Sequence, residues 1–292
     1  MRPTLILLVG IPGSGKTTYA TKYISEHKNT IHLSSDLIRK ELWGDEATQG
    51  DNNEVFSLMQ KRAIEALSNG QSVIYDATNI TRKDRAYIIS QCPKFAKIEA
   101  HIIWAPIETC IERDAARRRT VGKEVIDRML KRFQAPFYDE GIDDIYIRVS
   151  CDFDGVNYLN RCVSAMEIPH DNPHHTLNID DHCAKAARHI VENNGCDKLI
   201  IATALHDIGK PYVKSFTDSK GEPCEHAHYY QHQCVGAWMC CGFGDYYDVD
   251  PEFVWLISTH MEPFFESKYY KNLPAYLKNK IDLLHEADLA AH

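Results

Sequence analysis

Residues 4–17 constrain the fold more than any other part of the sequence. The apolar run Thr4–Val9 leads directly into Gly10-Ile11-Pro12-Gly13-Ser14-Gly15-Lys16-Thr17, and an amphipathic segment then continues to about His27. A buried strand, a loop of the form G-x-x-x-x-G-K-T and a helix are typical of a phosphate-binding loop. The glycines let backbone N–H groups turn toward phosphate oxygens, and the helix N-terminus adds partial positive charge. The sequence therefore predicts binding of a nucleoside triphosphate, and a chance Gly-rich turn is the weaker alternative.

Each residue type in this loop has a chemical task. Lys16 is expected to reach the outer phosphates of ATP or another triphosphate, and the Thr17 hydroxyl is expected to ligate Mg²⁺. The predicted nucleotide-binding set is Gly10, Pro12, Gly13, Ser14, Gly15, Lys16, Thr17 and Thr18.

Three further apolar segments, Thr30–Leu33, Ser72–Tyr75 and Ile98–Trp104, alternate with helical patterns. This alternation predicts a mostly parallel sheet flanked by helices. Asp36 follows the first of these strands and is either a general base for an attacking hydroxyl or a helix cap. Asp76 follows the second, where it could support the Mg²⁺ shell, hold Arg39, or only occupy a turn.

Basic residues cluster at two places beyond the loop. The segment 110–121 carries Arg113, Arg117, Arg118 and Arg119. Arg113 and Arg117 are four residues apart, so they share a helix face and fit a lid that closes over a triphosphate. The second cluster is Arg82, Lys83 and Arg85, which either face a phosphate backbone or are solvated.

Four strings in this half carry a resemblance to a known family. They are G-I-P-G-S-G-K-T, S-S-D-L-I-R, Y-D-A-T-N-I-T-R-K-D-R and R-D-A-A-R-R-R-T-V-G-K-E-V-I. Over about residues 1–150 the chain resembles the phage-type polynucleotide 5′-kinases. The resemblance implies that Asp36 is the general base, Arg39 contacts the phosphate of the acceptor, and Asp76 supports Arg39. The lid arginine falls best on Arg117, with Arg113 and Arg118 as alternatives, since Gly122 stands where the family usually has Pro.

Charge and histidine content divide the chain in two. Residues 1–150 hold 22 Lys and Arg against 20 Asp and Glu, whereas residues 151–292 hold 11 against 21, together with 12 of the 15 histidines. This asymmetry indicates two domains with different chemistry. The expected boundaries are a P-loop domain at 1–150, a linker at 151–167 and a second domain at 168–292.

Isolated His and Asp residues interrupt otherwise apolar helical segments in the second half. A buried charge without a partner is costly, and a bound metal relieves that cost. Imidazole with carboxylate suits one or two ions of Mn²⁺, Fe, Co²⁺, Ni²⁺ or Zn²⁺ better than Mg²⁺. The predicted metal ligands are His182, His206, Asp207, His232, His260 and Asp288.

This pattern, H…HD…H…H…D, resembles the HD-domain phosphohydrolases over about residues 168–292. The resemblance implies an all-α domain without a sheet, with His182, His206, Asp207 and Asp288 as the primary site. It also implies that His232 and His260 complete a second site with Asp207 bridging, so Asp207 is the catalytic centre. Lys210 either neutralises a phosphate oxygen or is solvated. Further candidates for substrate contact are His174, His175, His226 and His228. The printed sequence ends four residues after Asp288, so the last helix is expected to be weakly anchored.

The pairing of the two halves resembles bacterial end-healing enzymes that join an HD domain to a polynucleotide kinase. It implies a 5′-hydroxyl kinase and a 3′-phosphate or 2′,3′-cyclic phosphate hydrolase, with RNA or DNA ends and ATP as substrates and a ligase acting downstream. A nucleoside or metabolite kinase fused to a nucleotide phosphohydrolase is one alternative, and an ATP-dependent regulatory or scaffold protein is another. No apolar run reaches membrane-span length, and the N-terminal run continues into the loop, so a cytoplasmic protein without a membrane partner is expected.

Overall fold

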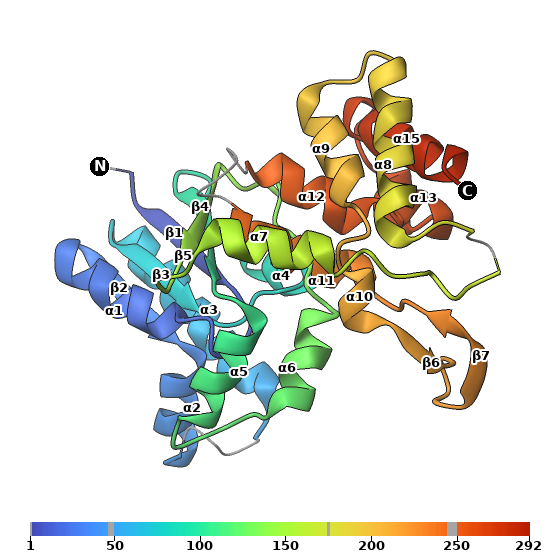
Figure 1. Cartoon of the computed structure of the whole chain (residues 1–292). Helices are drawn as coiled ribbons and strands as arrows, with labels where there is room; N and C mark the ends of the chain where they lie inside the picture. The colour runs from blue at the N-terminus through green and yellow to red at the C-terminus, as the bar shows by residue number, and fades with distance from the viewer. Residues whose placement is uncertain (1, 46–49, 174–175, 244–249) are drawn as a thin grey trace. The chain divides into compact units, whose positions relative to one another are not determined.

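The chain forms two compact units. The computed structural model describes residues 2–45, 50–173, 176–243 and 250–292, so His174 and His175 lie outside the described residues. One unit holds the residues up to Met129 together with Pro136–Asp152, and the other holds Leu130–Ala135 together with Phe153–His292. The first is an α/β structure, and the second is mainly helical (Figure 1).

A five-stranded sheet in the order β2-β3-β1-β4-β5 lies at the centre of the first unit, and all of its pairings are parallel. The prediction of a parallel α/β fold is confirmed. The sequence analysis missed the edge strand β5, whose alternating Asp-Ile-Tyr-Ile-Arg-Val is short and only partly buried. The elements in chain order are β1 (Thr4–Val9), α1 (Lys16–Glu26), β2 (Thr30–Ser34), α2 (Ser35–Trp43), α3 (Asn52–Ser68), β3 (Ser72–Asp76), α4 (Arg82–Gln91), β4 (Lys97–Trp104), α5 (Ile107–Ala115), α6 (Lys123–Leu130), the 3₁₀ turn η1 (Tyr138–Glu140) and β5 (Asp144–Val149).

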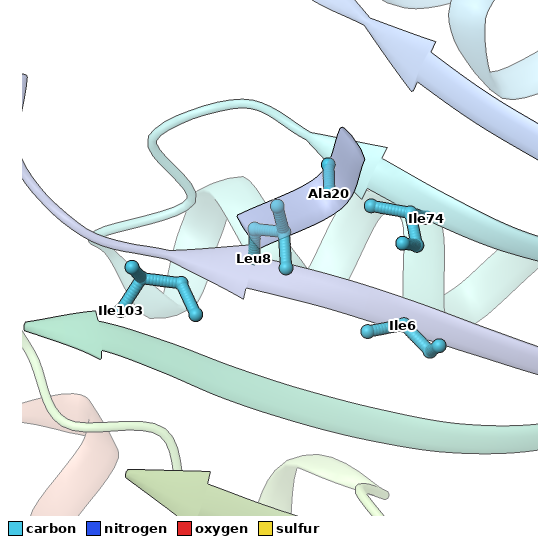
Figure 2. Close-up of a cluster of buried hydrophobic side chains, with 5 residues drawn as sticks. All are labelled: Ile6, Leu8, Ala20, Ile74 and Ile103. Carbon is cyan, nitrogen blue, oxygen red and sulfur yellow. The ribbon is translucent and has the colours of Figure 1, made fainter. Parts of the chain in front are cut away.

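The central strand β1 is buried on both faces, as expected for a parallel sheet covered by helices. On one face, side chains two residues apart on β1 meet neighbouring strands and helix α1. This cluster consists of Ile6, Leu8, Ala20, Ile74 and Ile103, all with no exposed surface (Figure 2). The small side chain of Ala20 lets α1 lie close to the sheet, which fixes the start of α1 just beyond the end of β1.

Strand register brings the acidic strand ends to the phosphate-binding loop. Asp76 pairs in register with Leu8 on one side and with Ser34 on the other. The loop after β1, the start of α2 and the end of β3 therefore lie at one edge of the sheet. Within the loop, Gly13 has a φ of +81°, and a Cβ there would lie 2.1 Å from the carbonyl oxygen of Cys110. Only glycine fits this position.

The second unit packs α8 against α9 and α15, and α12 against α9 and α11. Its elements are α7 (Gly155–Ser164), α8 (Ile179–Glu192), α9 (Asp197–Leu205), α10 (Lys210–Val213), β6 (Ser215–Thr217), β7 (Pro223–His228), α11 (His232–Cys240), the 3₁₀ turn η2 (Cys241–Phe243), α12 (Pro251–Thr259), α13 (Glu262–Phe265), α14 (Lys268–Lys271) and α15 (Ala275–Ala290).

The expectation that the second unit contains no sheet is wrong, because β6 and β7 form an antiparallel hairpin. The turn has its own local cause. Asp218 Oδ1 accepts hydrogen bonds from the backbone N–H groups of Lys220 and Glu222, at 2.7 and 2.9 Å. Gly221 supplies the left-handed conformation that the turn requires, with φ of +89°.

Two other expectations for this half also differ from the structure. Residues 151–167, predicted to be a linker, contain helix α7, which Asp154 caps by accepting from the Asn157 N–H at 3.0 Å. The helix is short and starts among turn residues, so its period was hard to recognise. The last helix, α15, buries Leu277, Ile281, Leu284 and Ala287, so it is well anchored.

Candidate active sites

The phosphate-binding loop closes around its own lysine. Lys16 Nζ donates hydrogen bonds to the carbonyl oxygens of Gly10 and Ile11, at 2.9 and 3.0 Å. Burial lowers the pKa of Lys16, and the negative charge of Asp76 opposes that effect. Ser14 Oγ is buried and makes no hydrogen bond within the described part of the chain. Phosphate oxygens would offer acceptors to both groups, so the loop fits a triphosphate.

Asp76 lies beside Thr17, the predicted Mg²⁺ ligand. The Thr17 hydroxyl donates to Asp76 Oδ2 at 2.9 Å, and His32 Nε2 lies 3.0 Å from the same oxygen. These hard oxygen ligands fit Mg²⁺. The implied support of Arg39 by Asp76 does not agree with these contacts, because Asp76 bonds to Thr17 and His32. The sequence analysis missed His32, since a histidine within a strand carried no functional signal.

Asp36 stands at the start of α2 with its side chain exposed, between two arginines. Its Oδ1 accepts from Arg39 Nη1 at 2.9 Å and from Arg119 Nη1 at 3.3 Å. Arg39 Nη2 also donates to Asn52 Oδ1 at 3.1 Å. The i, i+3 spacing explains the Asp36–Arg39 pair. The contact with Arg119 depends on the tertiary fold, since 83 residues separate the two.

The arginines of the predicted lid differ in their contacts and in their exposure. The Arg113 guanidinium donates to Ser150 Oγ and O, both at 2.9 Å, and lies 3.4 Å from the Gly13 carbonyl oxygen of the phosphate-binding loop. Arg117 and Arg118 are exposed. Burial is the main cause of the lowered pKa of Lys16, and the positive charge of Arg117 adds a smaller contribution in the same direction. Asp114 shapes the lid by accepting from the Val121 and Gly122 N–H groups, each at 3.0 Å.

Arg85 neither faces phosphate nor is solvated, so both sequence interpretations are wrong for it. Its side chain is fully buried and forms two 2.7 Å hydrogen bonds with the carboxylate of Glu140. It also donates to the Asn79 carbonyl oxygen at 2.9 Å. Lys83 on the same helix is exposed.

The six predicted metal ligands of the second unit converge on one buried centre. Asp207 lies in the middle, because its Oδ1 is 3.1 Å from His232 Nε2 and 4.0 Å from His260 Nε2. Its Oδ2 faces the other way, 3.3 Å from His206 Nε2 and 3.7 Å from His182 Nε2. The two oxygens of one carboxylate thus serve two different sets of histidines.

Asp288 closes the first set. Its Oδ1 lies 2.8 Å from His182 Nε2 and 3.4 Å from His206 Nε2. Three groups of three residues have ligand atoms within 4.8 Å of one another: His182, His206 and Asp288; Cys183, His206 and Asp207; and Asp207, His232 and His260. The first and third groups consist of predicted ligands and share no residue. Donor atoms that share one metal ion, each about 2.1 Å from it, lie a few ångströms apart, so each of these two groups fits one ion.

The histidine tautomers also suit metal ions. Nδ1 of His206, His232 and His260 lies 2.7, 2.9 and 2.8 Å from the backbone carbonyl oxygens of Thr203, Tyr229 and Ile257. A carbonyl can only accept, so each Nδ1 carries a proton. Backbone carbonyls often fix metal-binding histidines in this way, leaving Nε2 as the ligand. Nε2 of His206 is buried and, in the described ranges, forms no hydrogen bond.

Buried charge at the centre shifts several pKa values. Burial alone would raise the pKa of Asp207, but the positive charges of His206 and Lys210 hold it well below its usual range. Burial opposes a charge on His206, yet Asp207 raises its pKa well above the ordinary value. The pKa of His260 falls to about 3 because of burial and the nearby charges of His232 and His206. The His260 ring is therefore neutral at neutral pH.

Lys210 connects this centre to a histidine that the sequence analysis missed. Its Nζ lies 2.6 Å from Asp207 Oδ2 and 3.2 Å from His170 Nε2. His170 Nδ1 donates to the Leu177 carbonyl oxygen at 2.8 Å, which leaves Nε2 as the acceptor for Lys210. Lys210 is buried, so it is not a solvated helix-end residue. No pattern around His170, in E-I-P-H-D-N-P, indicated its role.

The family comparison concerns the first unit. Residues 5–136 match the family described as an AAA domain. The chain is 28% identical over 167 residues to Transcription factor bHLH140 of Arabidopsis thaliana, covering 54% of this chain and 17% of that protein. It is 26% identical over 236 residues to L-seryl-tRNA(Sec) kinase of Methanococcus maripaludis, covering 72% and 89%. A chain in the Structure of Pnkp1/Rnl/Hen1 complex is 27% identical, with 42% and 43% covered and a TM-score of 0.37.

None of the helices in the described ranges is long and apolar enough to cross a membrane. The chain spans less than a fifth of the length of the first relative and most of the second. Together, the strand–loop–helix geometry, the parallel sheet and the match of residues 5–136 show that the first unit is an α/β P-loop domain similar to AAA domains.

Proposed function

We propose that the chain is a bifunctional nucleic-acid end-healing enzyme. Its first activity transfers the γ-phosphate of ATP to a 5′-hydroxyl end, and its second removes a 3′-phosphate or opens a 2′,3′-cyclic phosphate. The observation that supports the proposal is the presence in one chain of a P-loop and a buried cluster of His and Asp side chains around Asp207.

The first reaction uses groups at the carboxyl edge of the sheet. Lys16 would leave the carbonyl oxygens of its own loop to bind the outer phosphates, and Thr17 beside Asp76 would hold Mg²⁺. Asp36 would take the proton of the 5′-hydroxyl as its oxygen attacks the γ-phosphorus, and ADP would leave. Arg39 and Arg119, which flank Asp36, would bind a phosphate of the acceptor strand.

The second reaction uses the His and Asp centre. Divalent metal ions, when bound, supply positive charge to the phosphoryl group and lower the pKa of water. Different residues would hold the two ions. His182, His206 and Asp288 would hold one ion, His232 and His260 would hold the other, and Asp207 would contact both. Lys210 would lie within reach of a phosphate oxygen, held in place by His170.

The two reactions have one purpose if the substrate is a cleaved strand. A ligase that joins a 5′-phosphate to a 3′-hydroxyl cannot seal a 5′-hydroxyl and a 3′-phosphate. The kinase repairs one side of such a break, and the hydrolase repairs the other. A ligase acting downstream is therefore the expected partner.

One experiment tests both halves. An oligonucleotide with a 5′-hydroxyl and a 3′-phosphate is incubated with ATP, Mg²⁺ and Mn²⁺, and both ends are read by mass spectrometry. The wild type should convert both ends, Asp36→Asn only the 3′ end and Asp207→Asn only the 5′ end. Unchanged ends with the wild type, under conditions where ATP and metal are bound, would contradict the proposal.

A second candidate is a kinase with a different acceptor. The similarity to a protein named L-seryl-tRNA(Sec) kinase favours it, because that alignment spans most of both chains. The nearly neutral charge of residues 1–150 also supplies little general attraction for nucleic acid. Equal kcat/KM values for a free nucleoside and for an oligonucleotide would favour this candidate over end healing.

A further inference from the structure

His32 is a partly buried histidine on the central sheet of the first unit. It lies on β2, two residues before Ser34, and Ser34 pairs in register with Asp76 at the end of β3. Residues two apart on a strand share a face, and paired residues of a parallel sheet point the same way, so His32 and Asp76 lie on one face. Ile74, on the same face of β3, packs against Ala20 of α1 (Figure 2). This face is therefore the one that α1 covers.

Oxygen Oδ2 of Asp76 receives two hydrogen bonds from two different elements. The Thr17 hydroxyl, in the first turn of α1, donates at 2.9 Å, and His32 Nε2 on β2 lies 3.0 Å away. An ionised carboxylate can only accept, so the proton between the ring and Asp76 is carried by His32 Nε2. The side chain of His32 is 11% exposed and that of Asp76 5% exposed, so little water competes for this bond. Two donors on one oxygen hold the carboxylate in one orientation.

The hydrogen bond from Thr17 to Asp76 decides which part of the Thr17 hydroxyl is available to a cation. A hydroxyl has one proton and two lone pairs. While the proton is donated to Asp76, the lone pairs remain available to ligate Mg²⁺, the role predicted for Thr17. If the carboxylate turned away, the hydroxyl could rotate its proton toward the cation. The orientation of Asp76 thus controls the ligand that Thr17 presents.

We propose that His32 is a positioning residue for the Mg²⁺ that accompanies the triphosphate. It acts through Asp76, which orients the Thr17 hydroxyl, and it does not need to touch the ion. The proposal rests on the kinase half of the proposed function and adds a residue to its triphosphate site. Hydrogen-bond partners of this kind hold metal ligands in place, and the loss of one typically costs about 10- to 100-fold in metal affinity.

The surroundings of His32 favour this role over simple packing. Strand positions that a helix covers usually carry apolar side chains. On this face the neighbouring strands carry fully buried aliphatic residues, namely Ile6, Leu8, Ile74 and Ile103. A polar ring placed in such a layer costs free energy unless it is hydrogen-bonded. An aliphatic residue at position 32 would fill the same layer but would give Asp76 no donor, so the histidine serves the carboxylate.

The test measures how strongly Mg²⁺ strengthens the binding of a fluorescent ATP analogue. For each variant, the dissociation constant without divalent ions is divided by that with saturating Mg²⁺. Both values come from one sample, so this Mg²⁺ ratio does not depend on the fraction of folded protein. His32→Leu should lower the ratio about 10-fold relative to the wild type. His32→Gln should retain it, because the Gln amide N–H can donate to Asp76 in place of Nε2.

A double variant separates an effect through Asp76 from a general loss of packing. In Asp76→Ala the Mg²⁺ ratio should already be low, and adding His32→Leu should lower it no further, because the residue on which His32 acts is gone. A packing defect would weaken ATP binding equally with and without Mg²⁺ and leave the ratio of His32→Leu at the wild-type value. That result, or a further fall of the ratio in the double variant, would overturn the proposal.

His27 provides a matched control. It is an exposed histidine at the end of α1, and its ring stacks on Tyr23 with centroids 3.9 Å apart. His27→Leu should leave the Mg²⁺ ratio unchanged, and a fall equal to that of His32→Leu would overturn the specific role of His32.

Failure of the kinase proposal gives a different result from failure of the role of His32. A wild type that binds no ATP analogue, with or without Mg²⁺, would overturn both. Binding that Mg²⁺ does not strengthen would overturn only the role of His32, because the phosphate-binding loop would then hold the triphosphate without an oriented Thr17. The measurement needs no acceptor, so the outcome does not depend on which hydroxyl the kinase uses.

Discussion

The Nε2 atoms of His232 and His260 face each other at 3.0 Å, while Nδ1 of each ring lies against a backbone carbonyl oxygen. Each Nδ1 therefore carries a proton. When both rings are neutral, the two facing nitrogens both present lone pairs, and a bound cation would relieve their repulsion. The pair therefore suits the proposed role of His232 and His260 as ligands of one ion.

We expect Asp207→Asn to lose metal from both positions, because its two oxygens face different histidine sets. His260→Ala should lose one ion and keep the other. Elemental analysis of protein loaded with Mn²⁺ measures the content, and unchanged 5′-kinase activity is the control for folding. Two ions per chain in Asp207→Asn would contradict the bridging role.

Metal affinity should rise with pH. Burial opposes a charge on His206, but Asp207 raises its pKa well above the ordinary value, so the metal-free centre keeps a proton on His206 at neutral pH. An ion that binds His206 must displace this proton. The metal affinity should then rise about tenfold for each unit of increase in pH, until the pH exceeds the pKa of His206. Calorimetric titration in buffers of different ionisation enthalpy measures the released proton, and an affinity independent of pH would contradict the prediction.

Asp36→Asn should lower the kcat of the kinase by about 10²–10⁴-fold, the usual cost of losing a general base. ATP binding should persist in this variant, because Asp36 is not part of the phosphate-binding loop. Lys16→Ala, by contrast, should lower kcat and also weaken ATP binding. Steady-state kinetics with an oligonucleotide acceptor and a fluorescent ATP analogue separate the two effects. Near wild-type turnover in Asp36→Asn would mean that the carboxylate only pairs with Arg39 and Arg119.

The two lid arginines should affect different substrates. Arg119 contacts Asp36 at 3.3 Å, so Arg119→Ala should mainly raise the KM for the acceptor. Arg117 is the arginine that the resemblance to polynucleotide kinases assigns to the lid over the triphosphate, so Arg117→Ala should mainly lower kcat at saturating acceptor. The measurement is a pair of KM and kcat values for each variant. The opposite pattern would assign Arg119 to the triphosphate.

Arg85→Leu should destabilise the first unit by about 3–5 kcal/mol, because it leaves the Glu140 carboxylate buried without its charged partner. The double variant Arg85→Leu with Glu140→Leu should lose less, since no charge is then left unpaired. Urea unfolding followed by circular dichroism measures both. Equal losses in the single and double variants would show that packing, and not charge, sets the contribution of Arg85.

Several features could be predicted from the sequence because they depend on local rules. The loop at residues 10–17 follows from the spacing of its glycines, and the parallel sheet follows from alternating strand and helix patterns. The six His and Asp residues of the second unit were predictable as a set, because polar residues on apolar helices require partners. By contrast, the hairpin β6–β7 and helix α7 were missed. Side-chain hydrogen bonds set the geometry of the turn between β6 and β7 and of the turn residues at the start of α7.

By itself, the sequence determined which residue types are available for chemistry and the local elements that carry them. Only the tertiary structure decided which of those residues contact one another. It placed Arg113 on Ser150, Arg119 on Asp36 and His170 on Lys210, over separations of 37, 83 and 40 residues. A helix or strand pattern repeats within a few residues, so it cannot specify which distant side chain a long, flexible arginine or lysine will reach. That choice follows from the packing of whole elements, which sets the distance between side chains far apart in the chain.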